Sequence, residues 1–585
     1  MPDNPDETPA RSSARQLGTL LRAFFMSGVR RRAWLWLGVL LLFLFVNTRV
    51  LVEMNYAQGS FFTALGNRDE GLYWNKILRW MILFVVSIPL VALYRYSEER
   101  LGLLWREWMT RHLLQRYFYN RVYYRLNGSD RVDNPDQRMT EDVKLFATTT
   151  LSLLLITLQS LVQVVAFIGV VWAITPNLLT ALLLYAALGT FCAWIIGRRL
   201  VSLNYSQFQK EADFRYSLIR VRDHAESIAF YRGEKRERGQ LRGRFAAVVD
   251  NTLRIIGWNR NLTFFITGYN YFALAVPVLI VAPLYFHGKA ELGVITQAQS
   301  AFATVLAAFS LIITQFERIS TYSAGIKRLG DLWDHLDEFD AEDERDAEDS
   351  ELEVNEDARS LALEGLTVRT PDRARQLVRD LSFRLRPGES ALLMGESGSG
   401  KSSLLRTIAG LWQSGSGTIN RPGLNRLMFL PQRPYMIMGT LRDQLLYPQF
   451  NSNLSDDAIK DALEKANLPD VLDRVDGNLE QTADWANMLS LGEQQRVSFA
   501  RLFLKKPIIA FLDEATSALD EPNEKDLYSK LRAAKMSYLS VGHRTTLKEF
   551  HDWLIVLKRD GSYTVERCQV SQPVKKSERK AEPVF

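Results

Sequence analysis

The sequence predicts two successive domains of different fold class, an α-helical domain that crosses a membrane six times and an α/β domain that lies in water. Three observations predict this division. The first half of the 585 residues holds six apolar runs of spanning length. The second half holds a glycine-rich loop between an apolar strand pattern and a helix start. A strongly acidic stretch at residues 331–357 separates the two halves.

The composition argues against several classes of protein. Lys and Arg number 72 against 66 Asp and Glu, so the formal net charge is only +6. The chain lacks the basic stripe interleaved with aromatic residues that is typical of nucleic-acid binding, and we expect no nucleic-acid partner. Its two cysteines, Cys192 and Cys568, allow neither a disulfide framework nor a zinc site, so both are expected to be free thiols.

Six apolar runs match the roughly 20 residues that a helix needs to cross the hydrocarbon core of a bilayer. Residues 1–32 are polar and rich in Arg, and we expect a cytoplasmic tail there. They do not suggest a cleavable signal, because the run that follows is too long and has no small-residue cleavage site. The predicted membrane domain covers residues 33–330, and its spans lie at 33–56, 76–94, 151–174, 178–197, 262–286 and 296–316.

The positive charges orient these spans. Arg30 to Arg32 precede the first span, and the long connections 95–150 and 198–261 are rich in Arg and Lys. The other connections are short and carry little positive charge. Because cytoplasmic connections carry the excess of Lys and Arg, both termini and the second domain are predicted to be cytoplasmic. No organellar transit pattern is present, so the expected location is a bacterial inner membrane.

The two long connections are expected to extend the spanning helices into the cytoplasm. Turn-forming residues interrupt the first connection between positions 125 and 143. We expect Asn134 to Gln137 to form an exposed elbow there, suited to docking on the second domain. The charged residues 211–237 of the second connection form either a solvated helix face or a segment that couples the two domains.

Residues 331–359 are interpreted as a solvated acidic linker. The second domain is predicted from 360 to 569, followed by a polar tail at 570–585 that we expect to be disordered.

The stretch SALLMGESGSGKSSLLRTIAG, residues 390–410, has the spacing of a phosphate-binding loop. The backbone N–H groups of such a loop, with the helix N-terminus, form a cradle for phosphate oxygens. Lys401 would neutralise the β- and γ-phosphates of ATP, and Ser402 would hold Mg²⁺. The flanking strand and helix argue against a chance match. The predicted ATP-binding residues are Gly395, Glu396, Ser397, Gly398, Ser399, Gly400, Lys401, Ser402, Ser403 and, farther along the chain, Gln432.

Polar residues that suit ATP hydrolysis follow three further apolar strands. Asp513 can orient Mg²⁺ through its water shell, and Glu514 can polarise the attacking water. His543 could hold that water and Glu514 in register. The alternatives are a helix cap for the acidic pair and a structural role for His543. We predict Glu514 and His543 as catalytic residues and Ser402, Gln432 and Asp513 as metal ligands.

The stretch MLSLGEQQR, residues 488–496, places small and polar residues at a helix start, where they suit an anion better than a core. The phosphate-binding loop already serves one nucleotide, so this second anion site suits a different one. The predicted contacts are Ser490, Leu491, Gly492, Glu493 and Gln494.

The order of these motifs resembles that of the ATP-binding cassette (ABC) family: phosphate loop, Gln432, LSLGEQQR, FLDEATSALD and His543. In that family the signature LSGGQ closes the ATP site of the opposite subunit. The resemblance implies a type IV exporter-like membrane domain fused to an α/β P-loop cassette, a homodimer with two composite sites, and ATP with Mg²⁺. It also implies that Ser517 and Asp520 of the SALD loop touch the dimer mate.

The chain departs from the family pattern in two places. Leu491 replaces the first Gly of the signature and Glu493 replaces its Gln, while Ser490 and Gly492 remain to contact phosphate. Residues 367–377 lack the aromatic ring that stacks on adenine in many cassettes, so Arg369 or Pro371 would contact the base instead.

Segments 134–143 and 211–237 resemble those of the peroxisomal fatty-acyl-CoA half-transporters and of their bacterial relatives, whose membrane half is similar to the SbmA/BacA peptide-uptake proteins. We therefore predict a homodimeric ATP-driven transporter of a peptide-like or other hydrophilic or amphipathic substrate, with uptake as the expected direction. The alternative cargo is a long-chain fatty acid or acyl-CoA. A different class of function, an ATP-gated channel or membrane-tethered regulator, stays open.

Polar residues within the apolar runs are costly in a bilayer and therefore suggest a substrate path. Arg49 and Glu53 have the spacing of a helical ion pair in the first span. For each residue singly the alternative is an interhelical hydrogen bond, whereas together they suggest a wet cavity. The predicted path residues are Arg49, Glu53, Gln159, Gln163, Asn270 and Gln299.

Overall fold

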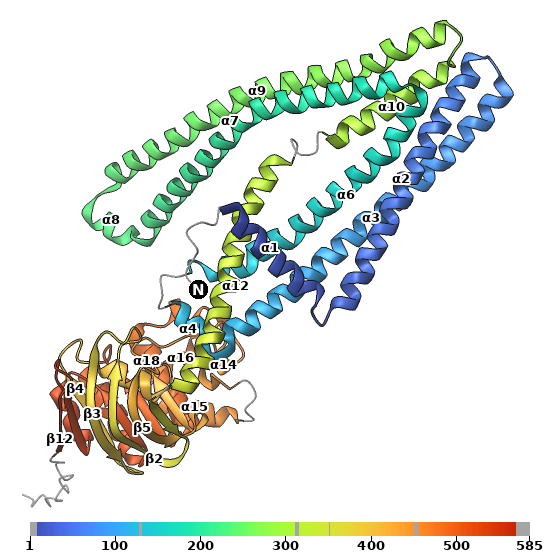
Figure 1. The fold of residues 1–585 in the computed structure, drawn as a ribbon. Coiled ribbons are helices and arrows are strands. Elements are labelled where there is room, and N and C mark those ends of the chain that lie inside the picture. Colours follow the sequence, from blue (N-terminus) through green and yellow to red (C-terminus); the bar gives the residue numbers. More distant parts are fainter. Residues whose placement is uncertain (1–8, 128–131, 310–314, 350, 450–453, 569–585) are drawn as a thin grey trace, which may run out of the picture. The chain divides into compact units, whose positions relative to one another are not determined.

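The computed structural model describes the chain except residues 1–8, 128–131, 310–314, 350, 450–453 and 569–585 (Figure 1). It divides into two compact units, residues 1–340 and residues 341–585. The first unit is helical, and the second combines sheets with helices.

Six long helices form the frame of the first unit. α2 packs along α3, α7 runs beside α9, and α10 contacts α2, α6 and α9 (Figure 1). Local sequence marks several of their starts, such as Asp69, whose carboxylate accepts from the backbone N–H of Leu72 at 2.9 Å. Their bounds are α2 Arg30–Gly66, α3 Glu70–Phe118, α6 Val143–Ile174, α7 Pro176–Asp223, α9 Glu234–Phe286 and α10 Leu292–Phe309.

Within the described residues, five of these helices are long and apolar enough to cross a membrane. The helix α7 contributes a shorter described apolar part, Pro176–Cys192. The predicted run at 296–316 corresponds to α10, and its last residues reach 310–314, which lie outside the described part of the chain. The helices are therefore at the predicted places.

The long connections are helical, as predicted. α3, α7 and α9 continue far beyond their apolar runs, and the short helix α8, Ala225–Tyr231, joins α7 to α9. At this tip Phe230 is 79% exposed and Tyr231 is 87% exposed. Large exposed aromatic side chains favour a contact surface over a merely solvated face. Smaller helices of this unit are α1 Pro9–Phe25, α4 Val122–Asn127 and α5 Pro135–Gln137.

The interpretation of residues 331–359 as a solvated linker is wrong. Residues up to Asp349 continue the helix α12, Phe316–Asp349, and strand β1, Leu352–Asn355, follows almost at once. Leu332, Leu336 and Phe339 recur at helical spacing and are buried in the core of the first unit. The acidic residues lie on the other face, where Asp337 and Asp340 pair with Arg116 of α3 at 2.6 and 2.7 Å.

The second unit has a six-stranded sheet in the order β12-β11-β4-β10-β9-β6 and a four-stranded sheet in the order β1-β5-β2-β3. In the larger sheet β11, β4, β10, β9 and β6 are parallel, and β12 is antiparallel at one edge. A two-stranded sheet pairs β7, Gly439–Thr440, with β8, Thr482–Ala483. The other strands are β2 Asp357–Arg369, β3 Gln376–Leu385, β4 Ser390–Gly395, β5 Gly415–Pro422, β6 Leu427–Leu430, β9 Ile509–Asp513, β10 Ser537–Val541, β11 Trp553–Leu557 and β12 Tyr563–Arg567.

The inner strands of the larger sheet are apolar on both faces because helices or the second sheet cover each side. Leu392 and Leu512 belong to one buried cluster, and Leu393 and Phe511 to another. The polar side chains of the predicted ATP site lie at or just beyond the strand ends. The helices are α13 Lys401–Ile408, α14 Leu441–Leu446, α15 Asp456–Lys465, α16 Asp470–Asp473, α17 Trp485–Met488, α18 Leu491–Lys505 and α19 Glu521–Ala533.

Candidate functional site

Four neighbouring parallel strands have their carboxyl ends on the same side of the larger sheet. Each of these ends carries part of the predicted site. The order β4-β10-β9-β6 places the phosphate-binding loop, His543, the Asp513–Glu514 pair and Gln432 next to one another. The register aligns Val541 with Asp513 and Leu430 with Leu512. Ligands of open α/β sheets bind at such carboxyl ends.

The loop at Gly395 to Gly400 closes around the ammonium group of Lys401. The Nζ atom donates to the backbone carbonyls of Gly395 and Glu396, both at 2.9 Å. A Cβ at Gly395 would lie 2.3 Å from the Leu557 carbonyl oxygen, so only glycine permits this close approach. Burial lowers the pKa of Lys401. The negative charges of Glu514 and Asp513 raise this pKa and partly offset the effect of burial. The loop therefore has the closed geometry expected of the predicted cradle, and its binding of phosphate stays a prediction.

The proposed Mg²⁺ ligands form an oxygen donor set, which suits this hard cation. The Ser402 hydroxyl donates to Asp513 Oδ1 at 3.2 Å. Burial raises the pKa of Asp513, and the bond from Ser402 and the nearby cations partly offset this. A half-buried carboxylate beside a hydroxyl is a site that a divalent cation would stabilise. Ser402 and Asp513 therefore fit Mg²⁺.

Glu514 lies at the centre of the predicted catalytic residues. Its Oε2 atom accepts from Gln432 Nε2 at 2.9 Å, and its Oε1 atom lies 2.9 Å from His543 Nε2. The backbone of Glu514 adopts a positive φ of 48°, a strained conformation for a residue with a side chain. The structure thus brings Glu514, His543 and Gln432 together, although 82 residues separate Gln432 from Glu514. The bond to Glu514 uses the amide nitrogen of Gln432, and the role of Gln432 as a metal ligand stays a prediction.

The signature stretch forms the start of α18, as predicted. The N-terminus of this helix is already capped by Ser490 and Glu493 of the same chain. Glu493 Oε2 accepts from the backbone N–H and hydroxyl of Ser490 at 2.8 and 2.9 Å. Burial opposes the charged form of Glu493, yet bonds from Arg474 and Ser490 outweigh it and lower its pKa. A phosphate at Ser490 would have to share these donors with Glu493.

The remaining signature and SALD residues are placed as follows. Leu491 is exposed at the first position of α18. Gln494 Nε2 donates to the backbone carbonyls of Ala486 and Leu489, both at 2.9 Å, so its amide nitrogen serves its own chain. Asp520 precedes α19 and accepts from Asn523 at 2.6 Å. A Cβ at Gly492 would lie 3.1 Å from the Ala518 carbonyl oxygen, so the signature stretch and the SALD loop are in close contact.

Sequence reasoning missed one residue of this site, Gln495. It is fully buried and bonds to Gln432, Ser517 and Ala518. The available signal was a glutamine on the face of α18 that also carries Ser498, Phe499 and Leu502, all of them buried.

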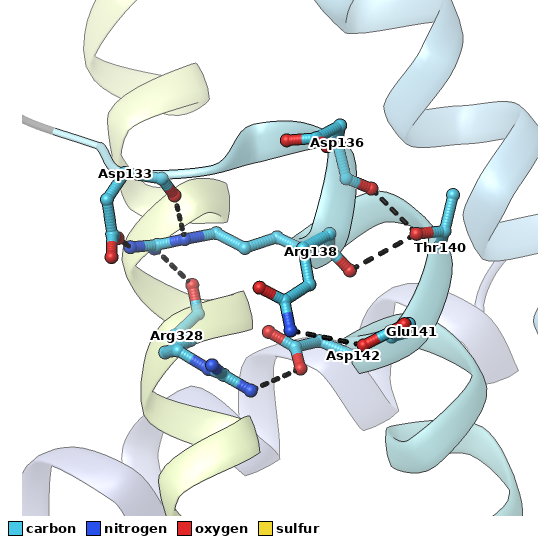
Figure 2. Close-up of polar contacts among 8 residues, drawn as sticks. Asp133, Asp136, Arg138, Thr140, Glu141, Asp142 and Arg328 are labelled. Atoms are coloured by element: carbon cyan, nitrogen blue, oxygen red, sulfur yellow. Dashed lines mark hydrogen bonds and ion pairs between the residues drawn. The ribbon is translucent and has the colours of Figure 1, made fainter. Parts of the chain in front are cut away.

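The elbow between α3 and α6 is partly exposed, through Asn134 and Asp136, and residues beside it bond to α12 (Figure 2). The guanidinium of Arg138 donates to the backbone carbonyls of Asp133 at 3.0 Å and Arg328 at 2.6 Å, and also pairs with the Asp133 carboxylate. Arg328 in turn pairs with Asp142 at 2.6 Å. Asp142 is 2% exposed, and this burial raises its pKa while Arg328 lowers it.

The described contacts do not join the membrane residues predicted as a substrate path into one group, and their role as a path stays a prediction. Glu53 pairs with Arg49 at 2.6 Å, as expected, and also with Arg79 of α3 at 3.0 Å, which the sequence did not suggest. Gln299 donates to the Leu274 carbonyl at 3.0 Å. The described contacts join neither of these to the half-buried Gln159 and Gln163 or to the exposed Asn270.

Two protein-family models match the chain. The model of ABC transporter transmembrane region 2 matches residues 20–286, and that of the ABC transporter matches residues 378–517. These matches fall on the helical unit and on the unit with the predicted ATP site.

Curated relatives match nearly the whole chain. An ABC transporter ATP-binding protein of Synechocystis is 45% identical over 91% of this chain and 81% of its own length. ABC transporter D family member 2, chloroplastic, of Arabidopsis thaliana is 37% identical over 96% and 90%. The human lysosomal cobalamin transporter ABCD4 is 30% identical over 94% and 96%.

A solved structure, a bacterial Atm1-family ABC exporter with ATP bound, has a TM-score of 0.69 and covers 91% of this chain and 95% of its own. At 18% identity this likeness establishes the fold, an exporter-like helical domain fused to a P-loop cassette.

Proposed function

The chain belongs to the ABC transporters, as a half-transporter of their D family with bacterial relatives, and from this premise we propose that two copies form a homodimer that moves an amphipathic anionic cargo. It is an ATP hydrolase coupled to transport. The observation that carries the proposal is the row of four strand ends, where Lys401, Asp513, Glu514, His543 and Gln432 meet.

Each of these residues has a physical role in the proposed cycle. Lys401 exchanges its bonds to the loop carbonyls for the phosphates of ATP. Ser402 and Asp513 would hold Mg²⁺, which would supply positive charge to the phosphates of ATP. Glu514 polarises the attacking water, and its two hydrogen-bond partners orient it. The second copy closes the site with its Ser490 and SALD loop.

For the cargo, a long-chain fatty acid or acyl-CoA replaces the peptide-like substrate as the leading candidate. None of the relatives named above is described as a peptide transporter, and the SbmA/BacA likeness gains no support from them. Membership of the D family agrees with the resemblance of segments 134–143 and 211–237 to fatty-acyl-CoA half-transporters. A corrinoid is the second candidate, because the human relative is named a cobalamin transporter.

The cargo is tested in proteoliposomes of a bacterial inner-membrane lipid mixture. We expect ATPase activity to rise with added acyl-CoA and to stay at its basal level with a peptide or cobalamin. If cobalamin or the peptide alone stimulates, the proposed cargo is wrong. In vesicles with outward-facing cassettes, import into a cell corresponds to ATP-driven release of preloaded cargo, and export to its uptake. Downhill flux without hydrolysis would instead identify a gated channel.

The catalytic assignment is tested with Glu514→Gln. Loss of the general base should lower the hydrolysis rate by roughly 10²- to 10⁴-fold while ATP binding persists, as measured by phosphate release and by a fluorescent ATP analogue. Glu521→Gln makes the same change at an exposed position on α19 and should leave the rate unchanged. A Glu514→Gln protein that turns over normally would show that another residue is the base.

A further inference from the structure

The side chain of Gln495 is completely buried and uses both ends of its amide. Its Nε2 atom donates to the backbone carbonyl of Gln432 at 3.0 Å and to the hydroxyl of Ser517 at 3.1 Å. Its Oε1 atom accepts from the backbone N–H of Ala518 at 3.0 Å. One side chain of α18 therefore holds two other segments, 63 and 22 residues away from it.

The segments that Gln495 joins serve different nucleotides in the proposed dimer. Gln432 bonds through its side chain to Glu514, the base for this chain's own ATP. Gln495 lies five residues after Ser490, on the helix whose start faces the ATP of the second copy. The SALD loop packs against that helix start at Gly492. Through its hydrogen bonds, Gln495 thus connects the Gln432 segment at this chain's own ATP site with the SALD loop, which packs against the signature stretch.

We propose that Gln495 is a positioning residue that couples the two ATP sites of the dimer. Binding of the second copy's ATP at Ser490 moves the start of α18, and Gln495 carries that movement to the Gln432 backbone and so to Glu514. The coupling rests on the proposed homodimer with composite sites. An apolar residue of the same length would fill the same space without transmitting position, because it makes no directional bond.

The test substitutes Gln495→Met, which keeps the length of the side chain and removes its hydrogen bonds. Gln444→Met is the matched control. Gln444 is also fully buried, and its amide also bonds backbone, donating to the Ile437 carbonyl at 2.6 Å and accepting from the Ile437 N–H at 3.0 Å. ATPase activity of both variants and of the wild type is measured in nanodiscs as a function of ATP concentration.

We expect Gln495→Met to bind a fluorescent ATP analogue as tightly as the wild type, since it leaves the phosphate-binding loop intact. Its kcat should fall by roughly tenfold, because Glu514 is no longer held in position. Its Hill coefficient should fall from about 2 to about 1, because the two sites no longer influence each other. Gln444→Met should lose thermal stability and keep the Hill coefficient. Equal cooperativity in Gln495→Met and wild type, or equal loss in both variants, would overturn the inference.

If Gln495→Met does not fold, Ser517→Ala removes one of the three bonds at a less buried place. Its Hill coefficient should fall partway, and Ser517→Thr, which restores a hydroxyl, should recover it; failure of that recovery would also overturn the inference. A wild type that hydrolyses no ATP refutes the proposed function instead. A cooperative wild type whose cooperativity survives Gln495→Met refutes the coupling alone.

Discussion

At the scale of single residues, the second unit contains polar side chains whose charge is controlled by burial. His551 is fully buried between the carbonyl of Leu547 at 2.7 Å and the hydroxyl of Ser540 at 2.9 Å. It also packs against the rings of Tyr528 and Tyr538. Burial lowers its pKa to about 4, although the bond to Leu547 and the charge of Asp552 oppose the shift.

This histidine should make the cassette sensitive to acid. In the unfolded chain His551 takes up a proton near its usual pKa of about 6.5, whereas in the folded chain it does so only near 4. Between these values the unfolded state binds more protons, so stability falls as the pH falls, by up to about 3 kcal/mol. His551→Gln should flatten this dependence in thermal unfolding between pH 7 and 4.5.

The matched control is His224→Gln, at an exposed position between α7 and α8, which should leave the pH profile of the wild type unchanged. An equally steep acid loss in His551→Gln would show that other groups cause it.

At the scale of elements, the ion pair of Asp142 with Arg328 joins the elbow to α12 (Figure 2). Because Asp142 is buried, its ion pair with Arg328 should contribute more to the stability of the fold than an exposed ion pair does. A double-mutant cycle with Asp142→Ala and Arg328→Ala should give a coupling energy on the order of 1–2 kcal/mol in thermal unfolding. The exposed pair Asp250–Arg254, at 2.9 Å on α9, should give about 0.3–0.5 kcal/mol. Equal coupling in the two cycles would contradict a fastened elbow.

The helix α12 gives a second prediction at this scale. A substitution in it should change the free energy of unfolding if the helix packs in the core, and should not if the segment is a solvated linker. Leu336 is 1% exposed. Leu336→Ala should therefore destabilise the membrane unit by about 2–5 kcal/mol. The same substitution in a solvated linker would leave the free energy of unfolding unchanged. Lys327→Ala, at an exposed position on the same helix, should stay close to the wild type. We would measure both by the temperature at which the chain unfolds in nanodiscs.

At the scale of the whole molecule, composite sites predict that two inactive chains can complement each other. Lys401→Ala damages the phosphate-binding loop, and Ser490→Arg damages the contact with the opposite nucleotide. Each variant alone gives a homodimer with two damaged sites. In a mixed dimer of twofold architecture, one site receives both defects and the other receives neither.

Mixed dimers, purified through two different tags after co-expression, should show ATPase activity that neither parent has. This activity should reach at most about half of the wild-type rate, because only one of the two coupled sites is intact. The purified single variants are the controls and should both stay inactive. If the mixed dimer is as inactive as its parents, each site must lie within one chain.

How much could be predicted from the sequence follows from the range of each interaction. The apolar runs and the loop from Gly395 to Ser403 depend on neighbouring residues, and the structure places both as predicted. The pair Arg49–Glu53 is also local, one helical turn apart, and is confirmed. The error at α12 had a different origin: the net charge of 331–357 hid an apolar stripe that repeats every three to four residues.

By itself the sequence determined where the spanning helices, the site strands and the motifs follow one another along the chain, because backbone preference and apolar periodicity act over a few residues. Only the tertiary structure decided that the strand ends adjoin, that Arg79 joins Glu53, that Arg328 holds Asp142 and that Gln495 bridges Gln432 and Ser517. These contacts join positions 22 to 186 residues apart. Their existence depends on how whole elements pack, and no local pattern contains that information.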